Sequence, residues 1–74
     1  MIDHGSADPV WEQLAAILRD KISTGELARG ARLQSIKDLA SEYGVSEGTV
    51  KHALAQLRDE SLIRTTNGKG SYVL

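Results

Sequence analysis

Apolar residues recur at helical spacing in the first third of the chain. They stand at i, i+3, i+4, i+7 and i+11, at Trp11, Leu14, Ala15, Leu18 and Ile22, and form one stripe along a helix. The stripe predicts a first helix over about residues 9–24. Asp8-Pro9 is typical of a helix start, with Asp8 capping free backbone N–H groups and Pro9 in the first helical position. Gly25 is the expected C-terminal stop.

Two shorter helices follow. Residues 35–43 present one apolar face, made of Ile36, Leu39, Ala40 and Tyr43. Residues 46–60 repeat the stripe with Val50, Ala53, Leu54 and Leu57. Ser35 and Asp38 have the spacing of a capping box, and Ser46 is a second N-cap.

Only Gly44 and Val45 link these two helices. So short a link forces a sharp crossing, in which the glycine permits the turn and the apolar residue fills the angle. The pattern indicates a helix-turn-helix, although an ordinary corner between two helices can have the same residues. In the preceding connector, residues 25–34, we expect a short extended piece around Arg32-Leu33.

The last segment changes period. Residues 62–65 and 71–74 are β-prone, and the stretch between them includes Asn67-Gly68, a strong hairpin signal. An isolated two-stranded hairpin is only marginally stable in water, so this one must pack on the helices. We therefore expect a mainly α fold with a small β-hairpin. This is a winged helix-turn-helix, three helices plus a C-terminal two-stranded wing, over residues 8–74 after a flexible tail at residues 1–7.

The composition limits the class of protein. A chain of 74 residues and 8.0 kDa has room for one domain with a thin core. Cysteine is absent, which excludes disulfides, thiolate zinc sites and cysteine nucleophiles. Because phenylalanine is also absent, the core must be aliphatic. There is no long apolar run and no signal pattern, so we expect a cytoplasmic protein without a membrane segment.

The net charge of −1 speaks at first against DNA as a partner, because DNA-binding domains are often basic. The charge is unevenly placed, however. Residues 1–30 carry three basic and five acidic residues, a sum of −2, and residues 31–74 carry six and five, a sum of +1. DNA binding therefore depends on where the cations lie.

From Pro9 onward, the chain resembles the DNA-binding domain of the GntR family of bacterial transcription regulators. The matching stretches are Pro9–Leu14, Ile22–Leu27, Gly30–Leu33 with Ser35, Asp38–Ala40, Tyr43–Ser46, Thr49-Val50, Ala53-Leu54 with Leu57, Leu62-Ile63 and Gly68–Val73. The opening Pro-x-aromatic-x-Gln is most similar to the HutC and YtrA branches. The resemblance implies binding to double-stranded operator DNA by a transcription regulator, a repressor by family habit.

Several positions depart from the family's usual residues. Gln34 and Arg29 stand where prolines are common, Glu47 where an arginine is usual, and Gly48 where a threonine is common. Some of these positions are on the reading surface, so the family's usual operator preference does not carry over. The family's regulators also carry an effector-binding or dimerisation domain, for which a chain that stops at Leu74 leaves no room.

The first turns of the third helix are the expected reading surface. When the apolar stripe faces the core, Gly48, Lys51 and His52 fall roughly opposite. A recognition helix meets base edges with its N-terminal turns. We therefore expect helix 46–60 in the major groove, with contacts from Ser46, Glu47, Gly48, Thr49, Lys51 and His52.

Each of these residues also has an ordinary structural interpretation. Ser46 caps the helix, either alone or together with a phosphate contact. Thr49 either contacts phosphate and thymine or is simply solvated. Lys51 either donates to guanine or phosphate or is likewise solvated. Glu47 is either favoured by the helix dipole or accepts from cytosine N4. Gly48 either permits close approach to DNA or marks a weakly constrained turn.

Further contacts are expected outside this helix. The resemblance implies a phosphate contact for Lys37, with Arg32 flanking the same DNA backbone. The wing, residues 64–72, is expected on the DNA backbone or in the minor groove. Its contact residues are Arg64, Asn67, Gly68, Lys69 and Gly70, of which Asn67 alternatively serves only the turn.

An enzyme finds no support in the sequence. His4 and His52 are the only histidines, and no paired carboxylates, phosphate loop, metal spacing or cofactor motif occurs. The alternative to DNA binding is a winged-helix module for protein–protein interaction, which the near-neutral charge allows. If DNA is the partner, so few cations imply weak binding by a monomer. The resemblance to the family, together with the few cations, implies a homodimer on a two-fold operator with half-sites about one helical turn apart.

Overall fold

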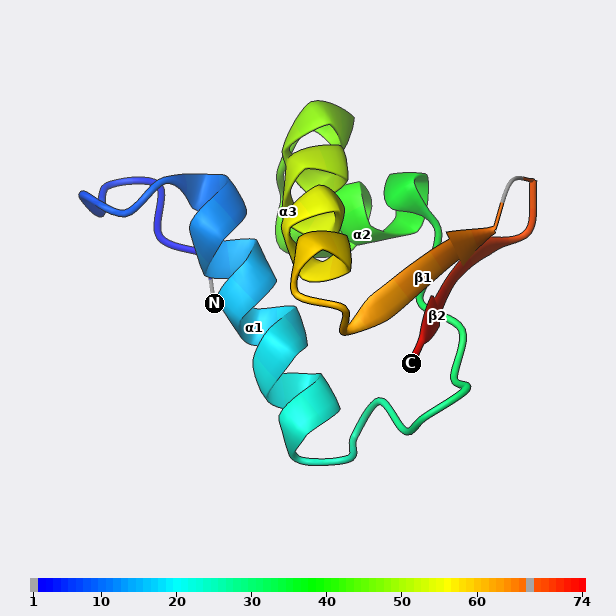
Figure 1. Ribbon diagram of the computed structural model, residues 1–74. Helices are drawn as coiled ribbons and strands as arrows, with labels where there is room; N and C mark the ends of the chain where they lie inside the picture. Colours follow the sequence, from blue (N-terminus) through cyan, green and yellow to red (C-terminus); the bar gives the residue numbers. More distant parts are fainter. Residues whose placement is uncertain (1, 67) are drawn as a thin grey trace.

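The computed structural model describes residues 2–66 and 68–74, which form three helices and a two-stranded sheet (Figure 1). The elements are α1 (Val10–Ser23), α2 (Ile36–Tyr43), α3 (Glu47–Asp59), β1 (Ile63–Thr66) and β2 (Gly70–Val73). The expected winged helix-turn-helix is confirmed, with element ends close to the predicted ones. None of the described helices is long and apolar enough to cross a membrane.

The start of α1 differs from the expectation. Pro9 is itself the N-cap, with an extended ψ of 146°, and its carbonyl accepts from the backbone N–H groups of Glu12 and Gln13. Asp8 lies one residue too early for its carboxylate to cap the helix, so the predicted cap is wrong. Instead, Gln13 Nε2 donates to the carbonyls of Asp3 and Asp8, at 2.8 and 3.0 Å, and ties the incoming chain to the helix.

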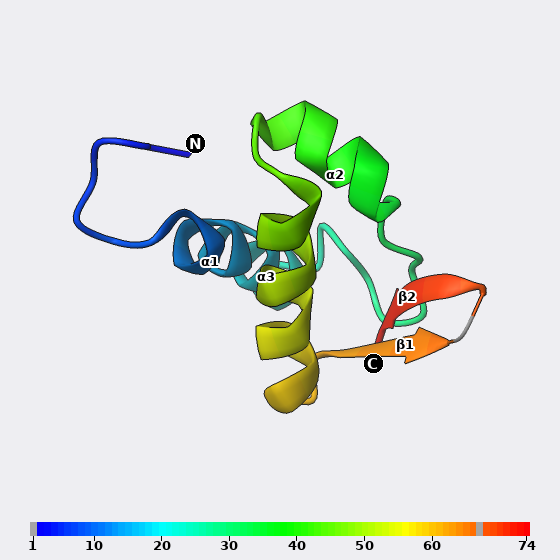
Figure 2. The same cartoon turned by 90° about the horizontal axis from the view of Figure 1, so that it is seen from above.

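The turn between α2 and α3 has the predicted chemistry. Ser35 Oγ accepts from the Asp38 N–H at 3.0 Å, and Ser46 Oγ accepts from the Thr49 N–H at 3.1 Å, so both predicted N-caps are confirmed. Gly44 ends α2 at a φ of 66°, in the left-handed region that favours glycine. The two helices consequently cross at the sharp angle visible in Figure 2.

The wing is supported along one edge by the connector. β1 and β2 pair as an antiparallel hairpin. On the other edge of β2, Arg32 forms a bridge with Tyr72, and the Leu33 N–H donates to the Ser71 carbonyl at 2.8 Å. The predicted extended piece around Arg32-Leu33 is therefore confirmed as a one-bridge extension of the sheet. Of the predicted turn residues, Asn67 lies outside the described residues.

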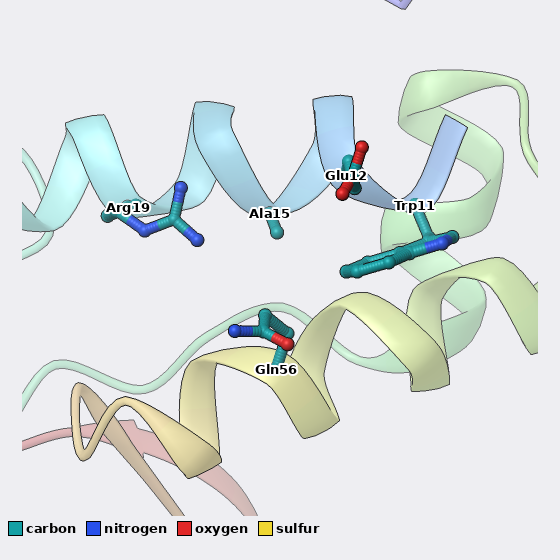
Figure 3. A pocket seen from close by; sticks show the side chains of 5 residues that line it. All are labelled: Trp11, Glu12, Ala15, Arg19 and Gln56. Atoms are coloured by element: carbon teal, nitrogen blue, oxygen red, sulfur yellow. The ribbon is translucent and has the colours of Figure 1, made fainter. Parts of the chain in front are cut away.

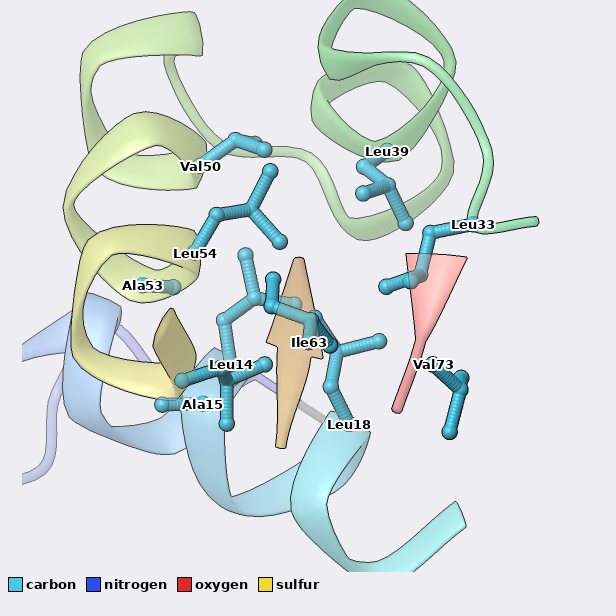
Figure 4. Packing of buried hydrophobic residues seen from close by; sticks show 11 residues of the cluster. Leu14, Ala15, Leu18, Leu33, Leu39, Val50, Ala53, Leu54, Ile63 and Val73 are labelled. Carbon is cyan, nitrogen blue, oxygen red and sulfur yellow. The ribbon is translucent and has the colours of Figure 1, made fainter. Parts of the chain in front are cut away.

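Aliphatic side chains from the helices, the connector and the hairpin fill one core (Figure 4). Leu14 of α1 and Val50 and Leu57 of α3 are completely buried. Ile63 and Val73 bring the hairpin into the same cluster. Each such burial stabilises the fold by roughly 1.5–3 kcal/mol, and the shared core holds the wing at a fixed place beside α3.

Candidate nucleic-acid interface

The first turns of α3 lie on the surface of the molecule. The buried face of the helix is made of Val50, Ala53, Leu54 and Leu57, as predicted. Glu47, Gly48 and Lys51 are exposed. Figure 2 shows α1, α2 and the hairpin arranged around α3. The structure thus leaves the predicted reading surface open to a partner.

Ser46 and Thr49 are joined to each other at the start of α3. Besides accepting from the Thr49 N–H, Ser46 Oγ donates to Thr49 Oγ1 at 2.9 Å. Thr49 is half-buried and Ser46 is exposed. The cap interpretation of Ser46 is confirmed, and the contact of either hydroxyl with DNA stays a prediction.

His52 lies against α1. Its ring stacks on Trp11 with 4.0 Å between the ring centroids and 18° between the ring planes. His52 remains exposed, so it stands at the edge of the reading surface where α3 meets the start of α1. Sequence reasoning placed Trp11 on the stripe of the first helix but did not pair it with His52.

Arg58 is a cation of α3 that sequence reasoning missed. It follows Lys51 by seven residues, or two helical turns, and therefore shares its side of the helix. Its Nη1 donates to Thr65 Oγ1 of β1 at 3.1 Å, and Thr65 Oγ1 lies 3.0 Å from Ser71 Oγ of β2. Arg58 thus stands between the recognition helix and the wing. The seven-residue spacing from Lys51 was the signal that could have found it.

The wing carries two cations, and a third, Arg32 of the connector, lies beside Gly70. A Cβ on Gly70 would lie 3.0 Å from Arg32 Nε, so the Arg32 side chain runs close along this strand. Gly70 has a φ of 89° and Gly68 one of 75°. Arg64 and Lys69 are exposed on the same hairpin. The structure therefore brings the predicted Arg32 to the wing.

Both cations of α1, Arg19 and Lys21, form ion pairs with carboxylates of this chain. Arg19 Nε and Nη2 each donate to a carboxylate oxygen of Glu60 at 2.7 Å. Lys21 lies 3.4 Å from Glu26 and 6.0 Å from the centre of the Tyr43 ring. These are the two ion pairs found within residues 2–66 and 68–74.

Arg19, the partner of Glu60, lines one end of an open cleft of about 240 Å³ between α1 and α3 (Figure 3). Hydrogen bonds from Arg19, and from Gln56 Nε2 at 2.8 Å, lower the pKa of Glu60 to about 2. The pKa of Arg19 is raised by the same contact. Trp11 closes the other end of the cleft, so α1 is anchored to α3 at two places.

The two sharply joined helices, the capped α3 and the hairpin beside it define a winged helix-turn-helix domain. A model of the bacterial regulatory proteins of the gntR family matches residues 11–73, and the chain belongs to this family. The chain is 38% identical over 65 residues to the mannosyl-D-glycerate transport/metabolism system repressor MngR of Escherichia coli, covering 88% of this chain and 27% of MngR. It spans 27% to 30% of the length of the first curated relatives that it matches.

Two solved structures show the same architecture. YtrA from Sulfolobus acidocaldarius, a GntR-family transcription factor, has a TM-score of 0.88 and 39% identity, covering 100% of this chain and 77% of that one. This agrees with the predicted resemblance to the YtrA branch. The AraR DNA-binding domain in complex with an operator has a TM-score of 0.92 and 19% identity, covering 100% of this chain and 93% of that one, and shares the fold. The named curated relatives are transcription regulators, in agreement with the expectation of a regulator rather than an enzyme.

Proposed function

We propose that the chain is the DNA-binding domain of a transcription regulator and binds double-stranded operator DNA with α3 in the major groove. The distribution of unpaired cations carries the proposal. Within the described part of the chain, no ion pair involves the cations of α2, α3 and the wing, namely Lys37, Lys51, Arg58, Arg64 and Lys69. The AraR domain, which has the same fold, is found with an operator, and this supports the assignment.

The contacts divide into base reading and backbone positioning. Base edges are read by the first turns of α3, through Ser46, Glu47, Gly48, Thr49 and Lys51, with His52 at the margin. Phosphates are held by Lys37 at the start of α2 and by Arg58 beside the wing. Arg32 and Arg64 extend this contact to the DNA backbone. The wing tip, with Gly68, Lys69 and Gly70, reaches phosphate or the minor groove.

The complete regulator is proposed to be a repressor that acts as a homodimer on a two-fold operator. MngR and NagR, both relatives of this chain, are named repressors. A single domain of net charge −1 makes few phosphate contacts. Pairing two domains on half-sites about one helical turn apart supplies the missing affinity. The site of action is the nucleoid in the bacterial cytoplasm.

Fluorescence anisotropy with a mixed duplex at two salt concentrations tests DNA binding. We expect affinity to fall steeply with salt, because phosphate contacts release counterions. Lys37→Ala and Lys69→Ala each lower the slope of log affinity against log salt by about one. Arg29→Ala is the matched control, since Arg29 is an exposed cation of the connector, lines a groove with Leu62 and Leu74, and is not among the predicted contact residues.

The control variant keeps the wild-type slope if the surface is assigned correctly. Equal slopes for all four proteins contradict the assigned phosphate contacts. No binding even at low salt and high protein concentration contradicts DNA binding by this domain and favours the protein–protein interaction module.

A further inference from the structure

Glu47 is the first residue of α3, and its neighbours already fill the structural roles at this end of the helix. Ser46 Oγ caps the helix and is bonded to both the N–H and the hydroxyl of Thr49. Glu47 is exposed, and within residues 2–66 and 68–74 its carboxylate makes no hydrogen bond and no ion pair, not even with the ammonium group of Lys51 one turn further on. The helix dipole favours an anion at this end. The same anion faces the side on which the proposed function places DNA phosphates, which repel it.

Gly48 is equally unexplained inside the described protein. It is not among the glycines with a positive φ. A Cβ at this position would meet only Ser46 Oγ, at the ordinary van der Waals distance of 3.8 Å. Alanine forms helices better than glycine, so neither space nor backbone conformation calls for glycine here. A bare backbone beside Glu47 instead lets the first turn of α3 come close to base edges in the major groove.

We propose that Glu47 reads a cytosine in the major groove by accepting a hydrogen bond from its N4 amino group. This inference rests on the proposed function and assigns a specificity-determining residue to it. An ionised carboxylate only accepts hydrogen bonds, so it needs a donor. The major groove offers two amino donors, cytosine N4 and adenine N6.

Cytosine fits the carboxylate better than adenine does. Adenine N6 lies beside its own N7, an acceptor that repels a carboxylate, whereas the major-groove edge of cytosine carries only the donor. Lys51 lies one turn further along the same side of α3 and supplies a donor for guanine O6 and N7. Glu47 also disfavours every DNA sequence that presents a hydrogen-bond acceptor opposite its carboxylate. Specificity then comes from repulsion of the wrong bases as well as from attraction of the right one.

Selection of bound sequences from random duplexes tests the inference, with the wild type, Glu47→Gln and Glu12→Gln compared. Glu12 is the matched control, because it is also an exposed acidic residue in the first turn of its helix. We expect the wild type and the control to enrich cytosine at one position of each half-site, by about tenfold over other bases. In Glu47→Gln the preference at that position moves to adenine, whose N6 and N7 suit an amide, while the other positions keep theirs.

The outcomes separate this inference from the proposed function. If Glu47→Gln selects the wild-type sequence, or binds all duplexes more tightly by the same factor, Glu47 acts only through its charge or not at all. The inference is then overturned and the proposed function stands. If the wild type binds no duplex, the proposed function fails and the inference fails with it. Thermal unfolding of the three proteins establishes that each is folded.

Discussion

Gly44 provides the turn between α2 and α3. It adopts a left-handed conformation, and its N–H and that of Val45 both bond to the Ala40 carbonyl. No atom lies within 4 Å of a Cβ built on Gly44. The requirement for glycine therefore comes from the backbone dihedral angle and not from crowding.

Replacing Gly44 with alanine is expected to lower the free energy of unfolding by about 1 to 2 kcal/mol, the penalty of a side chain in the left-handed region. Denaturant unfolding followed by circular dichroism measures the change. Gly5→Ala is the control, because Gly5 lies ahead of α1 and is not among the glycines with a positive φ. Equal losses in the two variants would show that the left-handed turn is not the source of the effect.

At the scale of elements, polar contacts join the recognition helix to both strands of the wing. Arg58 reaches Thr65 on β1, and Thr65 shares a hydrogen bond with Ser71 on β2. Ser71 is only 8% exposed, so its hydroxyl depends on this partner. The contacts set the position of the wing relative to α3, which decides whether both reach the same stretch of DNA.

A double-mutant cycle measures this coupling. Thr65→Val is expected to lower the free energy of unfolding by about 1 kcal/mol, because it leaves the Ser71 hydroxyl and the Arg58 guanidinium without this partner. Ser71→Ala is expected to cost less, because Thr65 Oγ1 keeps its hydrogen bond from Arg58. The loss of unfolding free energy in the double variant is expected to be smaller than the sum of the two single losses. The difference is about 0.5 kcal/mol or more, as is typical of residues in contact. Denaturant unfolding of the four proteins gives the coupling energy. Additive losses would mean that the two hydroxyls act independently.

The elements follow from local pattern, whereas their side-chain pairings do not. The stripes of apolar residues predict all three helices, and Ser35, Gly44 and Ser46 mark their ends because caps and left-handed turns have local chemical causes. The stacking of His52 on Trp11 depends on how α1 crosses α3, which no spacing within one helix reveals. The wrong cap at Asp8 has a local reason as well, because Pro9 is extended and shifts the helix start by one residue.

At the scale of the whole molecule, α1 packs along α3 and contacts it at two separate places. Trp11 contacts α3 through His52, and Arg19 contacts its C-terminal end through Glu60. Between these points the core is continuous, with Leu14 and Leu57 fully buried. A net charge of −1 is thus compatible with the proposed DNA contacts, because within the described residues the ion pairs involve the cations of α1 and none of those of α2, α3 and the wing.

The Arg19–Glu60 ion pair makes the stability of the fold depend on pH in the acid range. The pKa of Glu60 is lowered from 4.5 to about 2 in the folded protein. The ionised carboxylate therefore stabilises the fold fully above about pH 4.5, and this stabilisation is lost as the pH falls toward 2.

Thermal unfolding between pH 7 and pH 2 measures the difference between the wild type and Glu60→Gln. We expect the wild type to be more stable at pH 7, and the two proteins to converge as the pH approaches 2. Glu26→Gln serves as the control, because the 3.4 Å pair of Glu26 with Lys21 is more exposed and contributes less. A constant difference across this range would show that ionisation of Glu60 is not involved.

Trp11 is the one tryptophan of the chain, and its ring lies on the ring of a recognition-helix residue. Its indole is therefore an intrinsic fluorescent probe of this contact. The emission of an indole depends on its immediate neighbours, so fluorescence excited selectively at the tryptophan reports on the contact between the start of α1 and α3. Any partner that tilts the recognition helix, operator DNA included, changes that emission in an unmodified protein.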